Sequence, residues 1–188
     1  GYDKTRKICR RCAPFIPVNR ADGHQYDEGA TLETSCDVAA QVVTSVGGSG
    51  SGLWAQRDKL KVQYADLFLS LEGADLTSSA RVEIHEFNVG SFPSGELVTD
   101  NALAIGYFNN TSDKGWSRFT FLPYAPISAG IDIVLALRLK DTSTKIEWHR
   151  DDKVDLSDKE AKAYMHCGGS WDEAEVVDGM DQAQFSYR

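Results

Sequence analysis

Four cysteines are the side chains of this sequence best suited to metal binding or redox chemistry. Cys9 and Cys12 form a C-x-x-C pair, whereas Cys36 and Cys167 each stand alone. The pair supplies half of a zinc site that His24 and Cys36 would complete, because structural zinc takes Cys and His ligands. Two disulfides, with three possible connectivities, are a second interpretation, and free thiols are a third. No strand–helix–strand pattern surrounds the pair, which argues against a thioredoxin-type redox site.

A group of aspartates is a candidate calcium site, and it consists of Asp151, Asp152, Asp155 and Asp158. Calcium takes about six to eight oxygen ligands, but this spacing lacks the glycine and the distal glutamate of an EF-hand. A solvated acidic loop that leads into a helix is the simpler interpretation, because carboxylates stabilise a helix N-terminus. Zinc and calcium are thus the two cofactors for which the sequence offers ligands.

Catalytic motifs are not found in the sequence. The four histidines, His24, His85, His149 and His166, lack the H-E-x-x-H spacing of a metalloprotease. No serine lies in a G-x-S-x-G turn, and no spacing selects a carboxylate pair for glycoside hydrolysis. In the alternating segment at residues 81–87, Val82, Ile84 and Phe87 are expected to face mostly inward. His85 falls on the outward side, where a solvated imidazole is expected. We therefore expect a protein that is not an enzyme.

Three aromatic residues are candidates for a sugar-binding platform, namely Trp148, Tyr164 and Trp171. An exposed aromatic ring can stack on a sugar ring, whereas a buried one contributes a large apolar area to the core. Core packing is the alternative for each of the three.

The charge is unevenly distributed along the chain. The sequence has 20 basic and 28 acidic side chains, a net charge of −8. Residues 1–20 hold six of the basic residues and one acid, a net charge of +5, which leaves 14 basic and 27 acidic residues and −13 on the remainder. Such an arm is expected to dock on something negative, namely nucleic acid, a membrane surface or an acidic protein body. The same argument allows docking on the chain's own body, and the acidic body of another copy is the partner that we expect. The residues assigned to this contact are Arg6, Lys7, Arg10, Arg11 and Phe15.

The hydrophobic pattern predicts strands nearly throughout, because polar and apolar residues alternate over short runs separated by turn signals. The predicted strands cover residues 39–43, 59–71, 81–87, 116–121, 131–139, 145–149 and 182–187, and residues 131–139 are expected to be a central strand buried on both faces. Turns are predicted at residues 47–52, 73–75, 88–95, 109–115, 125–130 and 167–170. Ser157 with Glu160 predicts one short helix through a capping box, and the helix continues over Ala161, Lys162 and Ala163.

These elements predict an all-β fold, an antiparallel β-sandwich with one short helix and an extended N-terminal arm. A length of 188 residues fits one domain, which we place at residues 29–188 after an arm at residues 1–28. No apolar stretch is long enough to span a bilayer, so no membrane span is expected.

The order of several motifs resembles a family of jelly-roll β-sandwich modules of the choice-of-anchor type. Such modules are found in secreted bacterial and archaeal surface proteins and in phage virion proteins. The motifs are an opening A-x-Q strand, a W-x-x-F-x-F strand, a G-G-S-W turn and a closing D-x-A-x-F strand, at residues 39–43, 116–121, 168–171 and 181–187. Val43, Ile131 and Asp132 depart from the family pattern.

The resemblance and the arm together predict a non-catalytic structural or interaction module of an extracellular or virion surface assembly. Its partners are expected to be other copies of the chain or other subunits, and no nucleic acid is expected. The alternative is a carbohydrate-binding module of a secreted protein or adhesin, with glycans as partners.

Overall fold

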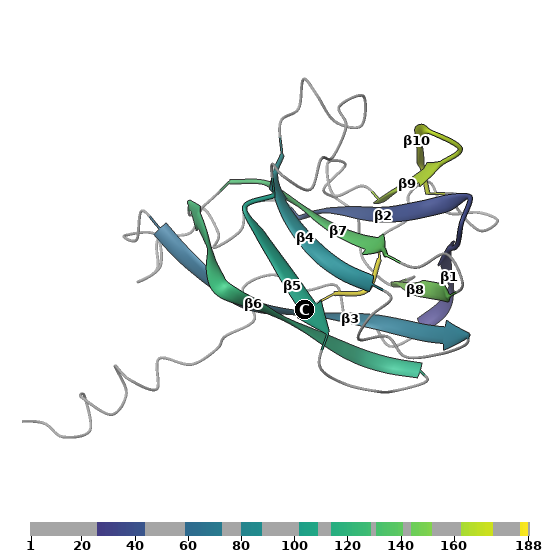
Figure 1. The fold of residues 1–188 in the computed structure, drawn as a ribbon, viewed down its shortest axis with the longest axis horizontal. Coiled ribbons are helices and arrows are strands. Elements are labelled where there is room, and N and C mark those ends of the chain that lie inside the picture. Colours follow the sequence, from purple (N-terminus) through teal and green to yellow (C-terminus); the bar gives the residue numbers. More distant parts are fainter. Residues whose placement is uncertain are drawn as a thin grey trace, which may run out of the picture.

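The computed structural model describes residues 26–43, 59–72, 80–87, 102–108, 114–128, 131–140, 144–151, 163–174 and 185–187. This part of the chain forms one antiparallel sheet of ten strands (Figure 1). Their bounds are β1 Tyr26–Leu32, β2 Cys36–Val43, β3 Lys59–Glu72, β4 Ala80–Glu86, β5 Ala104–Phe108, β6 Lys114–Ser128, β7 Ile133–Leu139, β8 Lys145–Asp151, β9 Ala163–Cys167 and β10 Ser170–Glu173. In space they follow the order β1-β8-β3-β6-β5-β4-β7-β2-β9-β10.

The sheet curls over a single main core. One buried cluster draws side chains from both halves of the sheet: Leu67 and Leu69 of β3 and Trp148 of β8 belong to it, and so do Ile84 of β4 and Leu137 of β7. Strands that lie far apart in the sheet order can share one core only if the sheet bends, because a flat sheet would expose its apolar face.

The all-β class and the antiparallel pairing are confirmed. The strand pairing shows one continuous sheet and not two separate sheets packed face to face, so the sandwich stays a prediction. In the described part of the chain, no helix is long and apolar enough to cross a membrane.

β7 is the central strand that the apolar run at residues 131–139 predicts. It lies between β4 and β2, and its first five residues are buried. Ile133, Leu135 and Leu137 face the main core. The alternate residues Val134 and Ala136 belong to a second, smaller apolar cluster on the opposite face of β2, β7 and β9.

The end of the chain packs against β8 and β3. The ring of Trp148 stacks on that of Phe185, with centroids 4.5 Å apart, and its Nε1 donates to the Ser186 carbonyl at 2.9 Å. The backbone N–H of Phe185 donates to Oε1 of Gln41 at 2.8 Å, deep in the core. Trp148 and Phe185 are both fully buried, so their packing joins the last described residues to the sheet.

The turn predicted at residues 167–170 is confirmed as the link between β9 and β10. Gly168 and Gly169 have φ values of 59° and 87°. Residues with a side chain rarely adopt these angles, which explains the two glycines at this turn.

The sequence patterns failed for one turn, for four strands and for the end of the predicted helix. The turn predicted at residues 125–130 is wrong, because β6 continues through this segment to Ser128. The strands β1, β5, β9 and β10 were not predicted. The helix proposed from Ser157 was expected to include Ala163, but in the structure Ala163 is the first residue of β9. The rest of that helix lies outside the described residues, as do the predicted turns at residues 47–52, 73–75 and 88–95.

Candidate functional site

The face of the sheet opposite the main core carries a row of directly paired polar and aromatic residues. We call the part of this face formed by β3, β6, β5, β4 and β7 the outer face. Its paired residues are Tyr64, Thr120, Tyr107, Arg81 and Arg138, one from each strand in sheet order. Directly opposed residues of antiparallel strands point to the same side, so these five side chains form a continuous row.

Arg118 is held on the outer face by Asp66 and Tyr64. Its Nε and Nη2 donate to the two carboxylate oxygens of Asp66 at 2.7 and 2.8 Å. The guanidinium also lies over the ring of Tyr64, 3.8 Å from the centroid. The hydrogen bond with Asp66 raises the pKa of Arg118, so this side chain stays charged. The Arg118 side chain is 48% exposed and that of Asp66 only 6%, so solvent meets the cation and not the carboxylate.

Glu83 is a second hidden carboxylate on the same face, and its side chain is 0% exposed. Its Oε1 accepts from Nε of Arg81 at 2.8 Å and from Nε of Arg138 at 3.0 Å. Its Oε2 accepts from Nη2 of Arg138 at 3.2 Å and lies 2.9 Å from Nε2 of His85. Four contacts to charged or polar donors compensate the loss of hydration that burial of a carboxylate imposes.

His85 lies on the face that the alternation predicts, but the expectation of a solvated imidazole is wrong. Only 4% of its side chain is exposed, because it is buried beside Glu83. Phe87, which was expected to face inward, packs instead against the smaller apolar cluster, which lies on the same face of the sheet as His85.

Four large apolar side chains are exposed on or next to β5 and β6, namely Leu103, Tyr107, Leu122 and Tyr124, and we call these four residues the apolar patch. These are the exposed large apolar side chains of the described residues, and Leu122 is 75% exposed. Phe119 and Phe121 of β6 point into the core, so the alternation of the strand turns Thr120 outward. Leu122 follows Phe121 and is exposed.

Gly106 explains why β5 turns the same face outward. A Cβ at Gly106 would come within 2.8 Å of the Phe121 ring, so the ring occupies the space that a side chain of residue 106 would need. Tyr107, the next residue, therefore points outward. Nζ of Lys140 lies 4.8 Å from the centroid of the Tyr107 ring, which places a cation at the border of the apolar patch.

A serine, a histidine and a glutamate meet on β3 and β8, but their geometry is not that of a catalytic triad. Oγ of Ser70 donates to Oε2 of Glu147 at 3.0 Å and lies 2.9 Å from Nε2 of His149. Because the single hydroxyl proton goes to Glu147, Nε2 of His149 must donate to Oγ and has no lone pair with which to accept that proton. In a triad the acid binds the other ring nitrogen, whereas Glu147 lies 3.5 Å from the same Nε2.

The Glu147 cluster has a structural effect, since it joins three strands. Oε1 of Glu147 also accepts from the backbone N–H of Gly29 in β1 at 2.7 Å. Burial raises the pKa of Glu147, but the hydrogen bonds from Gly29 and Ser70 outweigh this effect and leave the pKa below its ordinary value. Gly29 approaches the Trp148 carbonyl so closely that a Cβ would collide with the backbone of β8.

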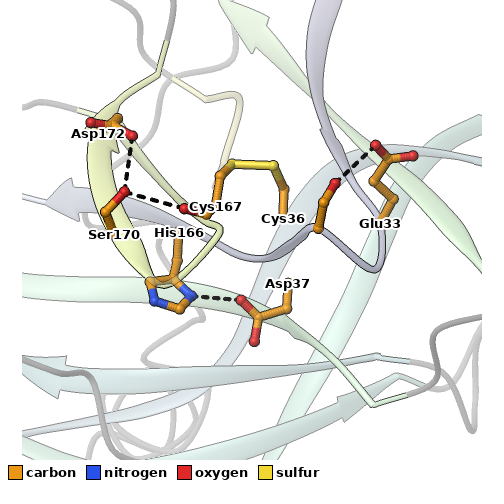
Figure 2. The surroundings of a disulfide bond; sticks show 8 residues. Glu33, Cys36, Asp37, His166, Cys167, Ser170 and Asp172 are labelled. Carbon is orange, nitrogen blue, oxygen red and sulfur yellow. Dashed lines mark hydrogen bonds and ion pairs between the residues drawn. A yellow bond between two sulfur atoms is a disulfide. The ribbon is translucent and has the colours of Figure 1, made fainter.

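Cys36 and Cys167 form a disulfide between β2 and β9 (Figure 2). This agrees with the disulfide interpretation for these two residues. It removes the Cys36 thiolate from the zinc site proposed with Cys9, Cys12 and His24, three residues that lie outside the described part of the chain. Among the described residues, no group of three His, Cys, Asp or Glu side chains is placed to hold a metal ion.

Carboxylates surround the disulfide, as Figure 2 shows for Glu33, Asp37 and Asp172. The side chains of Glu33 and Asp37 are 41% and 48% exposed. Nδ1 of His166 lies 2.7 Å from Oδ1 of Asp37, and Nζ of Lys145 lies 3.2 Å from Oε2 of Glu33. We call Glu33, Asp37, Asp172 and Glu173 the acidic end.

The structure separates the three aromatic residues proposed as a sugar platform. Trp148 is fully buried in the main core, where no ligand ring can stack on it. Tyr164 is buried in the smaller cluster on the opposite face. Trp171 is half-buried, and its ring lies 5.1 Å from that of His166.

The proposed arm contact and calcium site fall mainly outside the described residues. These are Arg6, Lys7, Arg10, Arg11 and Phe15 of the arm, and Asp152, Asp155 and Asp158 of the acidic group. Asp151 is the last residue of β8. β1 begins at Tyr26, three residues before the boundary proposed for the domain.

The pairing of Glu83 with Arg138 and the apolar patch were not predicted. The partner of Glu83 lies 55 residues further along the chain, and only the sheet order brings it close. A signal for the buried carboxylate did exist, since Arg81 and His85 flank Glu83 at alternate positions of one strand.

Comparisons of the chain with protein-family models, with curated proteins and with solved structures gave no match.

Proposed function

We propose that this protein is a non-catalytic interaction module of an extracellular or virion surface assembly, with a jelly-roll-like fold. The observation that carries the proposal is the disulfide between Cys36 and Cys167, set in an all-β sheet. Structural disulfides persist in oxidising compartments and on virion and cell surfaces, and are rare in the cytosol.

The position of the disulfide suits a protein that must survive outside cells. It connects residues 131 positions apart, so it restricts the unfolded chain strongly. Removal of a native disulfide typically costs about 2–5 kcal/mol. This contribution adds to the core and holds β9 against β2.

Two contacts support the jelly-roll resemblance. Gln41, from the opening motif, accepts the backbone N–H of Phe185, from the closing motif, at 2.8 Å. Trp171 of the G-G-S-W turn packs on the cluster that contains Ala40 of the same opening strand. Motifs that are distant in sequence thus meet in the core, as fold determinants do.

The basic arm is the proposed attachment to a neighbouring subunit. Residues 1–20 have a net charge of +5 and the rest of the chain has a net charge of −13. The described carboxylates of the acidic end are exposed. Individual surface ion pairs contribute only about 0–1 kcal/mol. Several of them, acting with apolar residues of the arm that the contact would bury, can fix a contact.

Deletion of residues 1–20 tests this function. We expect the shortened chain to keep its melting temperature but to lose self-association in light scattering coupled to size-exclusion chromatography. Association of the full chain should weaken with salt, because the screening length falls to about 3 Å at 1 M. Undiminished assembly of the shortened chain would reject the arm as the connector.

Carbohydrate binding is the second candidate, and Trp171 is the residue that favours it. This ring is half-buried beside His166 and Asp37, which could supply hydrogen bonds to a sugar hydroxyl. A glycan array with saturable binding that Trp171→Ala abolishes, while the protein stays folded, would favour this function. A blank array would count against it.

A further inference from the structure

The outer face presents cations around an apolar patch, because its carboxylates are buried. The cations are Arg81, Arg118, Arg138 and Lys140, and the carboxylates are Asp66 and Glu83. Both carboxylates lie beneath the guanidinium groups that bind them. Arg118, at 48%, and Lys140 are the exposed cations, whereas the side chains of Arg81 and Arg138 are only 22% and 18% exposed. Among the described residues this face therefore has more cations than carboxylates, although the chain has a net charge of −8.

The apolar patch gives this face the composition of a protein interface. Interfaces combine apolar and aromatic residues at the centre with arginine and a polar border. Leu122, Leu103 and Tyr124 supply the apolar part, and Lys140 lies at the border over Tyr107.

A polypeptide partner fits this face better than a carbohydrate does. Sugar rings stack on open aromatic faces, but the guanidinium of Arg118 covers one face of Tyr64 at 3.8 Å. The ammonium of Lys140 lies over the ring of Tyr107 in the same way. The aliphatic side chain of Leu122, the most exposed of the patch, matches an apolar side chain instead.

The chain itself carries a surface of complementary charge. The acidic end exposes four carboxylates, opposed by Lys145 and His166, and the disulfide holds its two strands together (Figure 2). Glu33 lies in the β1–β2 turn, Asp37 on β2, and Asp172 and Glu173 on β10, whereas the apolar patch lies on or next to β5 and β6. β4 and β7 separate β5 from β2, and β10 lies two strands further along, so the acidic end lies away from the patch of the same copy (Figure 1).

We infer that the outer face of one copy docks on the acidic end of a second copy. This inference rests on the proposed function and adds to it the surface and the partner. If the arm docks on the same neighbour, each contact raises the effective concentration of the other, and loss of either one weakens association strongly.

Two sets of exposed substitutions test the contact in the full-length chain. The face variant is Leu122→Asp with Lys140→Glu, and the end variant is Asp172→Lys with Glu173→Lys. We expect each to be monomeric at concentrations where the wild type associates, with affinity lowered about 10-fold or more. A 1:1 mixture should associate again, because the face variant retains its acidic end and the end variant retains its outer face.

The mixture also separates a lost contact from a misfolded protein, since an unfolded variant cannot restore binding. Lys140→Gln and Lys145→Gln form a matched pair, because each removes one exposed lysine. The first should weaken association, whereas the second removes a cation from the acidic end and should not. Equal effects of the two, or unchanged association of the face variant, would overturn the inference.

The arm deletion distinguishes the inference from the function on which it rests. If removal of residues 1–20 abolishes association while the face variant associates normally, the arm is the connector and the outer face is not. If the face variant fails and the arm deletion has no effect, the outer face is the contact and the arm is not.

Discussion

Replacement of Glu83 by Gln is the sharpest test of the buried charges on the outer face. The carboxylate is 0% exposed and accepts from Arg81 at 2.8 Å and from Arg138 at 3.0 and 3.2 Å. Glutamine has nearly the same shape but no charge, and its amide nitrogen would point at a guanidinium or at His85. Breaking a buried ion pair by removing one partner costs about 3–5 kcal/mol. The two guanidiniums keep 22% and 18% exposure, so we expect a loss near the lower limit, about 3 kcal/mol.

Urea denaturation measures this loss. With a dependence on denaturant of about 2 kcal/mol per M, the unfolding midpoint of Glu83→Gln should fall by about 1–2 M. Glu33→Gln is the matched control, because Glu33 also pairs with a cation, Lys145, but lies in solvent. Exposed ion pairs contribute little, so its midpoint should stay close to that of the wild type. Equal midpoints for the two variants would refute the claim that burial makes the Glu83 network important.

The remaining predictions concern the core, the disulfide and pH. Phe119→Ala and Phe185→Ala should each lower the unfolding free energy by about 3–5 kcal/mol in the same assay, because both rings are fully buried; a loss below 1 kcal/mol would place them outside the core. Replacement of both Cys36 and Cys167 by Ser should lower it by about 2–5 kcal/mol, and dithiothreitol should destabilise the wild type but not this variant. The pKa of Glu147 is lower in the folded chain than its ordinary value of 4.5, so its stabilising effect is present above that value and is lost as the pH falls through the folded pKa. Unfolding midpoints recorded from neutral to acidic pH should therefore fall less for Glu147→Gln than for the wild type, and parallel profiles would contradict this.

Local alternation in the sequence predicted much of the fold. The segments at residues 59–71, 81–87 and 145–149 alternate polar and apolar residues, and they became β3, β4 and β8. The apolar run at residues 131–139 correctly indicated a strand buried on both faces. These patterns succeed because one buried face of a strand requires a period of two.

β5 was missed because its sequence does not alternate. Gly106 stands where an apolar residue would mark the inner face, since the ring of Phe121 fills that space from β6. The apolar surface on the inner face of β5 is therefore supplied at this position by Phe121 of β6 and not by a residue of β5 itself. β6 was predicted too short for a related reason, because Pro123 and the run at residues 125–130 have the composition of a turn although the strand continues to Ser128.

The contacts of the candidate site depend on the order of strands in space. Cys36 and Cys167 are 131 residues apart, and their pairing was one of three possibilities that the spacing left open. Trp148 illustrates the same difficulty for a single residue. Its position in an alternating strand is compatible with the core face and with the exposed face. The packing of Phe185 on its ring shows that it belongs to the core.

The way in which the arginines are held bears directly on how the outer face would bind a partner. A free arginine side chain loses rotamer freedom on binding, which costs about 0.5–1.5 kcal/mol per side chain. Arg118 has lost this freedom before any partner arrives, because Asp66 holds two of its nitrogens and Tyr64 lies beneath its plane. Lys140 is restrained by one ring contact alone in the described part of the chain. If the face docks as inferred, the rigid Arg118 should therefore fix the orientation of the partner, while Lys140 adapts to it.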